Sequence, residues 1–215
     1  EPSIDYVVTK IPRFDFEKFP TSNGILGVQM QSVGEVMAIG RTFRESIQKA
    51  FRSLEVGLIG FEPKKTDYRP LDINKISFPT SFRLLKIWQA LKEDYSIEKL
   101  YEQTKIDPWF LYQLKKLTDI KITDKFYKDN LLFLKQEGFS DKQIAKSLKK
   151  EELEIRKERI KNKILPVYKM VDTCAAEFEA QTPYCYSTYE QFNEVNRFKE
   201  DSVIILGGGP NRIGQ

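Results

Sequence analysis

The chain has 215 residues, 40% of them hydrophobic and 31% charged, a balance that fits a globular protein with a substantial core. No apolar run reaches the roughly 20 residues of a membrane helix and no signal-peptide pattern is evident, so we expect a cytoplasmic protein. The absence of histidine excludes an imidazole base, a Ser-His dyad and a His-ligated metal. The net charge of +4 is modest, and the surplus of Lys and Arg is concentrated between residues 83 and 165.

Residues 1–60 have a mixed α/β pattern. The segments IDYVVTKIPRF and SVGEVMAIGRT are rich in β-branched residues and predict two strands at the edge of a sheet. Thr42 and Glu45 form an S/T-x-x-E capping box, which predicts the start of a helix that Gly57 is placed to end. Its apolar positions share one face of that helix: Phe43, Ile47, Ala50, Phe51 and Leu54.

A proline-containing connector, residues 61–79, leads into a segment that is helical to about residue 162. Asp107 followed by Pro108 predicts one helix start, Gly138 a helix end, and Ser140 with Gln143 a second capping box.

A loose repeat relates two parts of this helical segment. Two sets of residues have the same internal spacing, 44 residues apart: Ser96, Leu100, Asp107 and Leu111, and Ser140, Ile144, Glu151 and Ile155. Each set fits a short helix, a turn and a longer helix. The repeat therefore predicts stacked helical pairs.

The segment from residue 165 to 215 returns to a non-helical pattern. Val203–Leu206, followed by three glycines, predicts a buried parallel strand that enters a glycine turn. Such a turn can cradle pyrophosphate, so a fragment of a dinucleotide-binding enzyme is one alternative. The helix, second strand and acidic residue that this reading needs do not follow in the sequence. We expect Tyr6–Thr9 and Val203–Leu206, as strands without partners, to be disordered or to pair with another copy.

The stretch GFSDKQIAKSLKKEELEIRKER resembles a helix-turn-helix, so a basic nucleic-acid-binding module is a second alternative. A DNA-reading helix should offer Arg, Lys, Asn or Gln to the major groove and keep carboxylates away from phosphate. The second helix here would instead present four carboxylates, those of Glu151, Glu152, Glu154 and Glu158.

Other chemistry-bearing residues have simpler interpretations. Aromatic side chains at helical spacing are expected in the core or at a subunit interface rather than as stacking platforms: Trp88, Trp109 and Phe110. Cys174 and Cys185 match no zinc or redox spacing and are expected to be buried free thiols. Four acidic residues lack a diagnostic spacing and are expected to cap helices or form ion pairs: Asp5, Glu35, Asp172 and Glu177.

Three blocks occur in order along the chain: EPSIDYVVTKIPRFDFEKF, QSVGEVMAIGRTFRESIQKAFRSLEVG and PVYKMVDTCAAEFEAQTPYCYSTYE. Together with the following ILGGGPNRIGQ, they resemble the large subunit of carbamoyl-phosphate synthase. The resemblance covers the whole chain, closely in these blocks and loosely in the helical middle. It implies a mainly α fold, a helical oligomerisation domain flanked by partial α/β segments of two ATP-grasp synthetase halves.

The resemblance also implies domain limits. Residues 1–60 would be the last strands and helix of the first, carboxyphosphate half. Residues 61–200 would be the oligomerisation domain with its linkers. Residues 201–215 would be the first strand and glycine loop of the second, carbamoyl phosphate half.

By the same resemblance, the chain is a noncatalytic connector and oligomerisation segment, inactive by itself. The parent ligase makes carbamoyl phosphate from bicarbonate and glutamine-derived ammonia for pyrimidine and arginine biosynthesis. Its cofactors, ATP, Mg and K, would bind outside this chain, so no catalytic, cofactor-binding or metal-binding residue is assigned here. The implied partners are a second copy, the glutaminase small subunit and the two synthetase halves, and neither nucleic acid nor a membrane. Three residues would lie near the wall of a carbamate tunnel: Ile4, Met30 and Val33.

Overall fold

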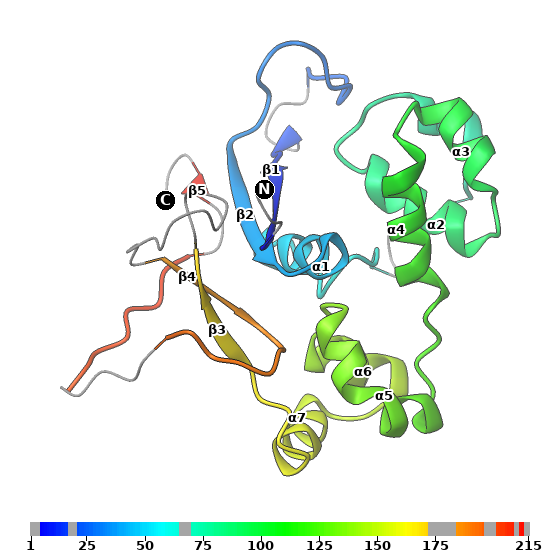
Figure 1. The fold of residues 1–215 in the computed structure, drawn as a ribbon. Helices are drawn as coiled ribbons and strands as arrows, with labels where there is room; N and C mark the ends of the chain where they lie inside the picture. Colours follow the sequence, from blue (N-terminus) through cyan, green and yellow to red (C-terminus); the bar gives the residue numbers. More distant parts are fainter. Residues whose placement is uncertain are drawn as a thin grey trace.

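The computed structural model describes residues 5–16, 21–64, 70–171, 184–195, 201–208 and 211–212. Within these ranges the chain forms seven α-helices, one short 3₁₀ helix and two small antiparallel sheets (Figure 1). The prediction of a mainly α fold is confirmed. No helix in this part of the chain is long and apolar enough to cross a membrane.

The first sheet contains both strands predicted near the N-terminus. Strand β1 (Val7–Arg13) runs antiparallel to β2 (Gly34–Gly40) over its whole length. The expectation that Tyr6–Thr9 lacks a partner is wrong, because Val7 to Thr9 pair with the C-terminal end of β2. Val36 and Ala38 of β2 are buried where the sheet packs against helix α1 (Phe43–Ser53).

The C-terminal part of the chain adds a short third strand to this sheet. Strand β5 (Asn211–Arg212) pairs antiparallel with the start of β2. The buried strand predicted at Val203–Leu206 is wrong, since these residues form no strand and each is at least 84% exposed. A buried parallel strand needs neighbouring strands and helices that cover both faces, and the described residues supply neither here.

Helix α1 begins as predicted but ends earlier. The Thr42 hydroxyl accepts the Glu45 N–H at 3.1 Å, whereas the Glu45 carboxylate accepts the N–H of Arg41 rather than that of Thr42. Only half of the predicted capping box is therefore present. The helix stops at Ser53, and the backbone takes a left-handed φ of +54° at Glu55, two residues before Gly57.

The remaining helices follow a 3₁₀ turn, η3 (Ile73–Ser77). Their bounds are α2 (Arg83–Lys92), α3 (Ile97–Thr104), α4 (Pro108–Asp119), α5 (Asp124–Gln136), α6 (Asp141–Leu148) and α7 (Glu152–Lys161). The predicted start at Asp107 and Pro108, the capping box of Ser140 and Gln143, and the helix end at Gly138 are all confirmed. In Figure 1, α2 to α4 and α5 to α7 form two groups with α1 between them.

The 44-residue repeat is real, and the structure extends it from two helices to three. Helix α5 ends as α2 does: the Phe139 N–H reaches the Leu134 carbonyl, just as the Tyr95 N–H reaches that of Ala90. Left-handed residues recur at matching positions: Asp94 and Gly138, and Lys105 and Lys149. The four apolar residues of the predicted repeat are all buried: Leu100, Leu111, Ile144 and Ile155. We call α2–α4 the first unit and α5–α7 the second unit.

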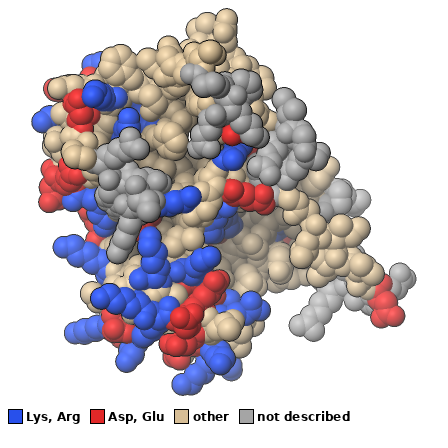
Figure 2. Space-filling view, turned by 180° about the vertical axis from the view of Figure 1, so that it is seen from behind, with Lys and Arg blue, Asp and Glu red and all other residues tan. Residues whose placement is uncertain are grey.

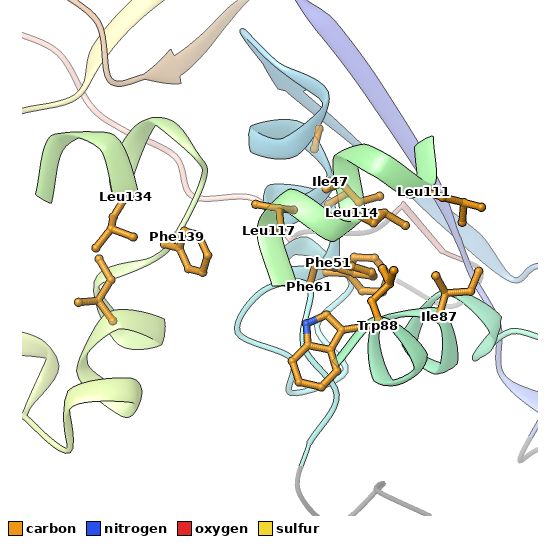
Figure 3. Packing of buried hydrophobic residues seen from close by; sticks show 14 of the residues in the cluster. Ile47, Phe51, Phe61, Ile87, Trp88, Leu111, Leu114, Leu117, Leu134 and Phe139 are labelled. Atoms are coloured by element: carbon orange, nitrogen blue, oxygen red, sulfur yellow. The ribbon is translucent and has the colours of Figure 1, made fainter. Parts of the chain in front are cut away.

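Each unit contributes its own group of core side chains (Figure 3). Phe51 of α1 and Phe61 lie 5.2 Å apart, among first-unit residues that include Trp88 and Leu114. Leu134 and Phe139, from the second unit, lie to one side of that group and belong to the same hydrophobic cluster. Trp88 is therefore a core residue, one of the two roles predicted for it.

A hairpin of β3 (Val167–Met170) and β4 (Cys185–Thr188) follows α7, and β4 lies beside β2. Tyr186 and Thr188 are buried, whereas Cys185, on the opposite face of the strand, is exposed. The prediction of a buried thiol is wrong for Cys185 because strand residues alternate between faces. Cys174 lies outside the described residues.

Candidate functional site

Helix α4 presents aromatic side chains on its outer surface. Its inward positions, Leu111 and Leu114, are at most 1% exposed. The side chains on either side of Leu111, those of Trp109, Phe110 and Tyr112, are 52%, 42% and 49% exposed. We call these three residues the association face, because half-exposed aromatic side chains are typical anchors of protein interfaces.

The association face is held in place from its N-terminal end. The Asp107 carboxylate accepts the Trp109 N–H at 2.8 Å, and Pro108 occupies the first turn of the helix. The rings of Trp109 and Phe110 lie 5.0 Å apart, and each is within 5.7 Å of Phe43 on α1. The side chains of Trp109 and Phe110 are therefore ordered before any partner binds, which lowers the entropy lost on association. Trp109 and Phe110 thus fit the interface role that the sequence predicted.

The helix pair α6 and α7 is formed as the helix-turn-helix resemblance predicted, but its outer surface has mixed charge. Figure 2 shows Lys and Arg gathered over the lower part of the molecule, with Asp and Glu among them. Glu151, Glu152 and Glu154 are exposed at the start of α7. Carboxylates at this end would oppose a phosphate backbone.

A second feature lies where α1, the connection from α5 to α6, α7 and the β3–β4 hairpin meet. A cavity of about 270 Å³ opens there, and its wall includes Lys49, Arg52, Lys135, Asp141 and Tyr189. We call it the charged cavity. The sequence reasoning did not identify it, because its residues come from separate segments that lie as far apart in the sequence as Glu45 and Tyr189.

Asp141 holds two cations at one side of the charged cavity. The Lys135 Nζ lies 2.7 Å from Asp141 Oδ1, and the Arg159 Nε lies 3.1 Å from Oδ2. Burial lowers the pKa of Lys135 to about 8, although Asp141 acts against this shift. Burial acts to raise the pKa of Asp141, but Lys135 and Arg159 together hold it below its ordinary value. The Tyr189 ring covers both cations, with its centroid 5.1 Å from the Lys135 Nζ and 5.6 Å from the Arg159 guanidinium carbon.

The other side of the cavity is built on α1. Glu45, buried to 2% exposure, accepts hydrogen bonds from the Arg41 N–H and the Thr188 hydroxyl and pairs with Lys49 at 2.8 Å. Arg52 donates to the Gly138 carbonyl at 2.6 Å, and no carboxylate of the described residues lies within 4 Å of its guanidinium. Burial lowers the pKa of both Lys49 and Arg52.

The residues expected near a tunnel wall are not brought together in the described part of the chain. Ile4 lies outside the described residues. Met30 is 87% exposed and Val33 is half-buried, both on the connection between β1 and β2. Neither lines the charged cavity. Their role remains a prediction.

The acidic residues form ion pairs rather than a metal site. Asp5 pairs with Arg41, and Glu35 pairs with Lys10 at 2.9 Å, as expected, while Asp172 and Glu177 lie outside the described residues. The described residues contain no group of three or more Cys, Asp or Glu that could hold a metal ion. Gly207 has no neighbour within 4 Å of an added Cβ, and no cradle for a nucleotide phosphate forms around it. The binding of ATP, Mg and K outside this chain remains a prediction.

An exposed aromatic face on a repeated helical unit is typical of a protein-association module. A family model described as the oligomerisation domain of the carbamoyl-phosphate synthetase large chain matches residues 35–163. The chain is 49% identical to the carbamoyl phosphate synthase large chain of Archaeoglobus fulgidus, over 100% of this chain and 21% of that protein. It is 50% identical to the arginine-specific, chloroplastic large chain of Arabidopsis thaliana and 48% to the large chain of Pseudomonas aeruginosa, again over its full length.

The chain belongs to the carbamoyl phosphate synthase large-chain family and contains its oligomerisation domain. It spans about a fifth of the length of the curated relatives it matches. The resemblance seen in the sequence is thus confirmed, and nothing in these comparisons supports nucleic-acid binding. The domain limits at residues 60 and 200 remain predictions.

Proposed function

We propose that this chain joins copies of a carbamoyl phosphate synthase large chain through the association face on α4. The observation that carries the proposal is the position of that face: it lies inside residues 35–163, the segment that matches the oligomerisation domain. Trp and Tyr side chains of this size bury large apolar areas without many rotamers to fix, which suits an anchor between two subunits.

We further propose that the chain connects the two synthetase halves of a glutamine-dependent ligase in the cytoplasm. Residues 1–60 and 201–215 would belong to the first and second ATP-grasp halves. The exposure of Val203–Leu206 supports this, because an apolar β-branched run of this kind is suited to burial in a sheet that the described residues do not supply. ATP, Mg and K would bind in those halves, and the glutaminase small subunit would supply ammonia. The arginine-specific name of the Arabidopsis relative supports a role in arginine biosynthesis, beside pyrimidine biosynthesis.

The tunnel assignment remains part of this proposal. Ile4, Met30 and Val33 are apolar and lie before β2, in the segment assigned to the first half. The 87% exposure of Met30 supports a contact with a part of the enzyme outside this chain. A carbamate path would need such apolar, unreactive side chains.

The test of self-association is the solution mass of the 215-residue chain, measured by light scattering over a concentration series at two salt levels. We expect a mass that rises with concentration and changes little between moderate salt levels, since an apolar face does not depend on charge. Tyr112→Ser should weaken association at least about fivefold, as loss of an interface anchor costs more than about 1 kcal/mol.

The matched control is Tyr184→Ser, which removes an aromatic ring that is 68% exposed directly before β4. This variant should associate like the wild type. A strict monomer at every concentration would contradict autonomous self-association. Steeply salt-dependent binding to DNA in a parallel titration would favour the nucleic-acid alternative instead.

A further inference from the structure

We propose that the charged cavity binds a small phosphate-type oxyanion between Arg52 and Lys135. This site is separate from the association face, and the inference does not depend on self-association. Four observations carry it: the local excess of positive charge, the unused hydrogen-bond donors, the size of the cavity and the comparison of the two repeat units.

The wall carries three cations, Lys49, Arg52 and Lys135, and three carboxylates, Glu45, Asp141 and Glu152. The surplus of positive charge comes from Arg159, which is not part of the wall but pairs with Asp141. Lys49 is balanced by Glu45, but Lys135 and Arg159 share the single carboxylate of Asp141. Arg52 adds a further cation whose partner is a neutral carbonyl, that of Gly138. The remaining acidic side chain of the wall, Glu152, is exposed at the rim. Cations that have lost water without gaining a counterion are unfavourable, and a bound anion would compensate them.

The cations also retain donors that can face a ligand. A guanidinium has five N–H groups, and among the described residues Arg52 uses one of them, on the Gly138 carbonyl. The Lys135 ammonium has three, and it uses two, on the Phe139 carbonyl and on Asp141. The planar fork of an arginine beside an ammonium matches the oxygens of a phosphate group. The cavity, about 270 Å³, holds such an ion with several waters, since one water takes about 30 Å³.

The first unit indicates that the charges are not required by the fold. With the 44-residue repeat, the positions of Lys135 and Asp141 in the second unit correspond to those of Leu91 and Ile97 in the first unit. Leu91 and Ile97 are both buried in the core. The same three-helix arrangement thus forms with apolar side chains at these positions. A buried ion pair is seldom more stabilising than well-packed apolar residues, so its presence in the second unit points to binding rather than to stability.

The experiment is isothermal titration calorimetry of the 215-residue chain with inorganic phosphate at pH 7, against sodium chloride and sodium acetate at matched ionic strength. We expect saturable heat with phosphate and none with chloride. Phosphate should also raise the melting temperature in a concentration-dependent manner, because it binds only the native state. Acetate binding as strong as phosphate binding would overturn the assignment to the phosphate class, and heat that does not saturate would show an adventitious ion only.

Two variants locate the site. Arg52→Gln and Lys135→Met should each weaken phosphate binding at least about tenfold, a loss of one charge-assisted contact. The control Arg156→Gln removes an exposed arginine of α7 and should bind phosphate like the wild type. Equal affinity in all four proteins would overturn the proposal. If Arg52→Gln lowers stability, its phosphate-induced shift in melting temperature remains a valid readout, because it is compared with the same variant in chloride. Tyr112→Ser should still bind phosphate, so failure of the association face and failure of this site are distinguishable.

Discussion

At the scale of single residues, Asp141 is the common partner of two buried cations. It is the carboxylate that both Lys135 and Arg159 contact, and all three side chains are at most 12% exposed. Removing its charge leaves two buried cations next to each other. The loss of folding stability on removing one partner is far larger than the net stabilisation by the intact ion pair, because a buried charge without a partner is strongly unfavourable.

We therefore predict that Asp141→Asn lowers the free energy of unfolding by about 3 kcal/mol, measured by urea denaturation at pH 7. The advantage of the wild type should be complete above the ordinary pKa of 3.8 and should disappear as the pH falls through the lower native pKa. The control is Asp119→Asn, which removes an exposed pair with Lys115 and should cost less than about 0.5 kcal/mol. Equal losses in the two variants would contradict the role given to Asp141.

Burial of Lys135 predicts a dependence of folding stability on pH in the alkaline range. Its pKa is about 8 in the folded chain and 10.5 when exposed, so between these values the unfolded state binds more protons. The stability of the wild type relative to Lys135→Met should thus rise from pH 8 to 10.5, by an amount of the order of 3 kcal/mol. The groups that face Lys135 are Asp141, Arg159, Arg52 and Tyr189, and all are retained in the variant. A pH-independent difference between the two proteins would refute the assignment.

At the scale of elements, the end of α5 depends on the backbone of Gly138. Its φ is +86°, and a Cβ at this position would lie 2.9 Å from the Glu45 Cα and 3.0 Å from the Glu45 carbonyl oxygen. Backbone atoms of a packed helix cannot easily move, so both the left-handed conformation and the close approach of α1 require glycine.

Gly138→Ala should lower the free energy of unfolding by at least about 2 kcal/mol, combining left-handed strain with a steric clash. The equivalent residue of the first unit, Asp94, has a φ of +60° and already carries a side chain in solvent. Asp94→Ala is therefore the control and should change stability by less than about 0.5 kcal/mol. Thermal or urea unfolding of both variants gives the comparison, and similar losses would show that the contact with α1 is unimportant.

The elements were predictable where the signal is local. Both N-terminal strands, the cap at Asp107 and the capping box at Ser140 depend on neighbouring residues, and each was predicted correctly. The capping role of Glu45 was only partly predicted. Its carboxylate contacts Arg41, Lys49 and Thr188, and Thr188 lies 143 positions away in the sequence. The charged cavity combines short-range pairs, such as Glu45 with Lys49 and Lys135 with Asp141, with distant contacts that join α1 to the second unit and the hairpin. Comparison of Leu91 with Lys135 across the repeat would have been the one sequence signal for it.

At the scale of the whole molecule, Arg44 of α1 links the two repeat units. Its guanidinium donates to Gln113 on α4 at 2.5 Å and forms two hydrogen bonds with Glu137 at the end of α5. The Glu137 side chain is 7% exposed, so this is a mostly buried contact. The two units are thus joined through α1.

Replacing Arg44 by Met should destabilise the chain by about 2 to 3 kcal/mol and leave Glu137 without its cation. Because the units lose their common link, hydrogen exchange in α5 to α7 should increase more than in α2 to α4, where the core around Phe51 and Trp88 is retained. Lys115→Met, which removes an exposed pair on α4, is the control. Uniform acceleration of exchange throughout the chain would contradict coupling through α1.

At this scale, the sequence of a strand does not show which other strands will lie beside it. The run Val203–Leu206 has the composition of a buried strand, yet it is exposed because burial depends on other elements rather than on the run itself. Conversely, Tyr6–Thr9 was expected to lack a partner, but β2 lies close enough in the chain to pair with its residues 7 to 9.

The position of the β3–β4 hairpin has a consequence for the geometry of a longer protein. The chain leaves the first sheet through α1, passes through both helical units and returns in β4 beside β2, where Glu190 pairs with Arg41 at 2.8 Å. The chain therefore enters the helical units from β2 and leaves them into β4, and these two strands are neighbours. We call this pair of strands the base of the helical units. The separation of whatever precedes β2 and follows β4 is set by this base, so a homologue with one unit more or fewer would keep the same separation.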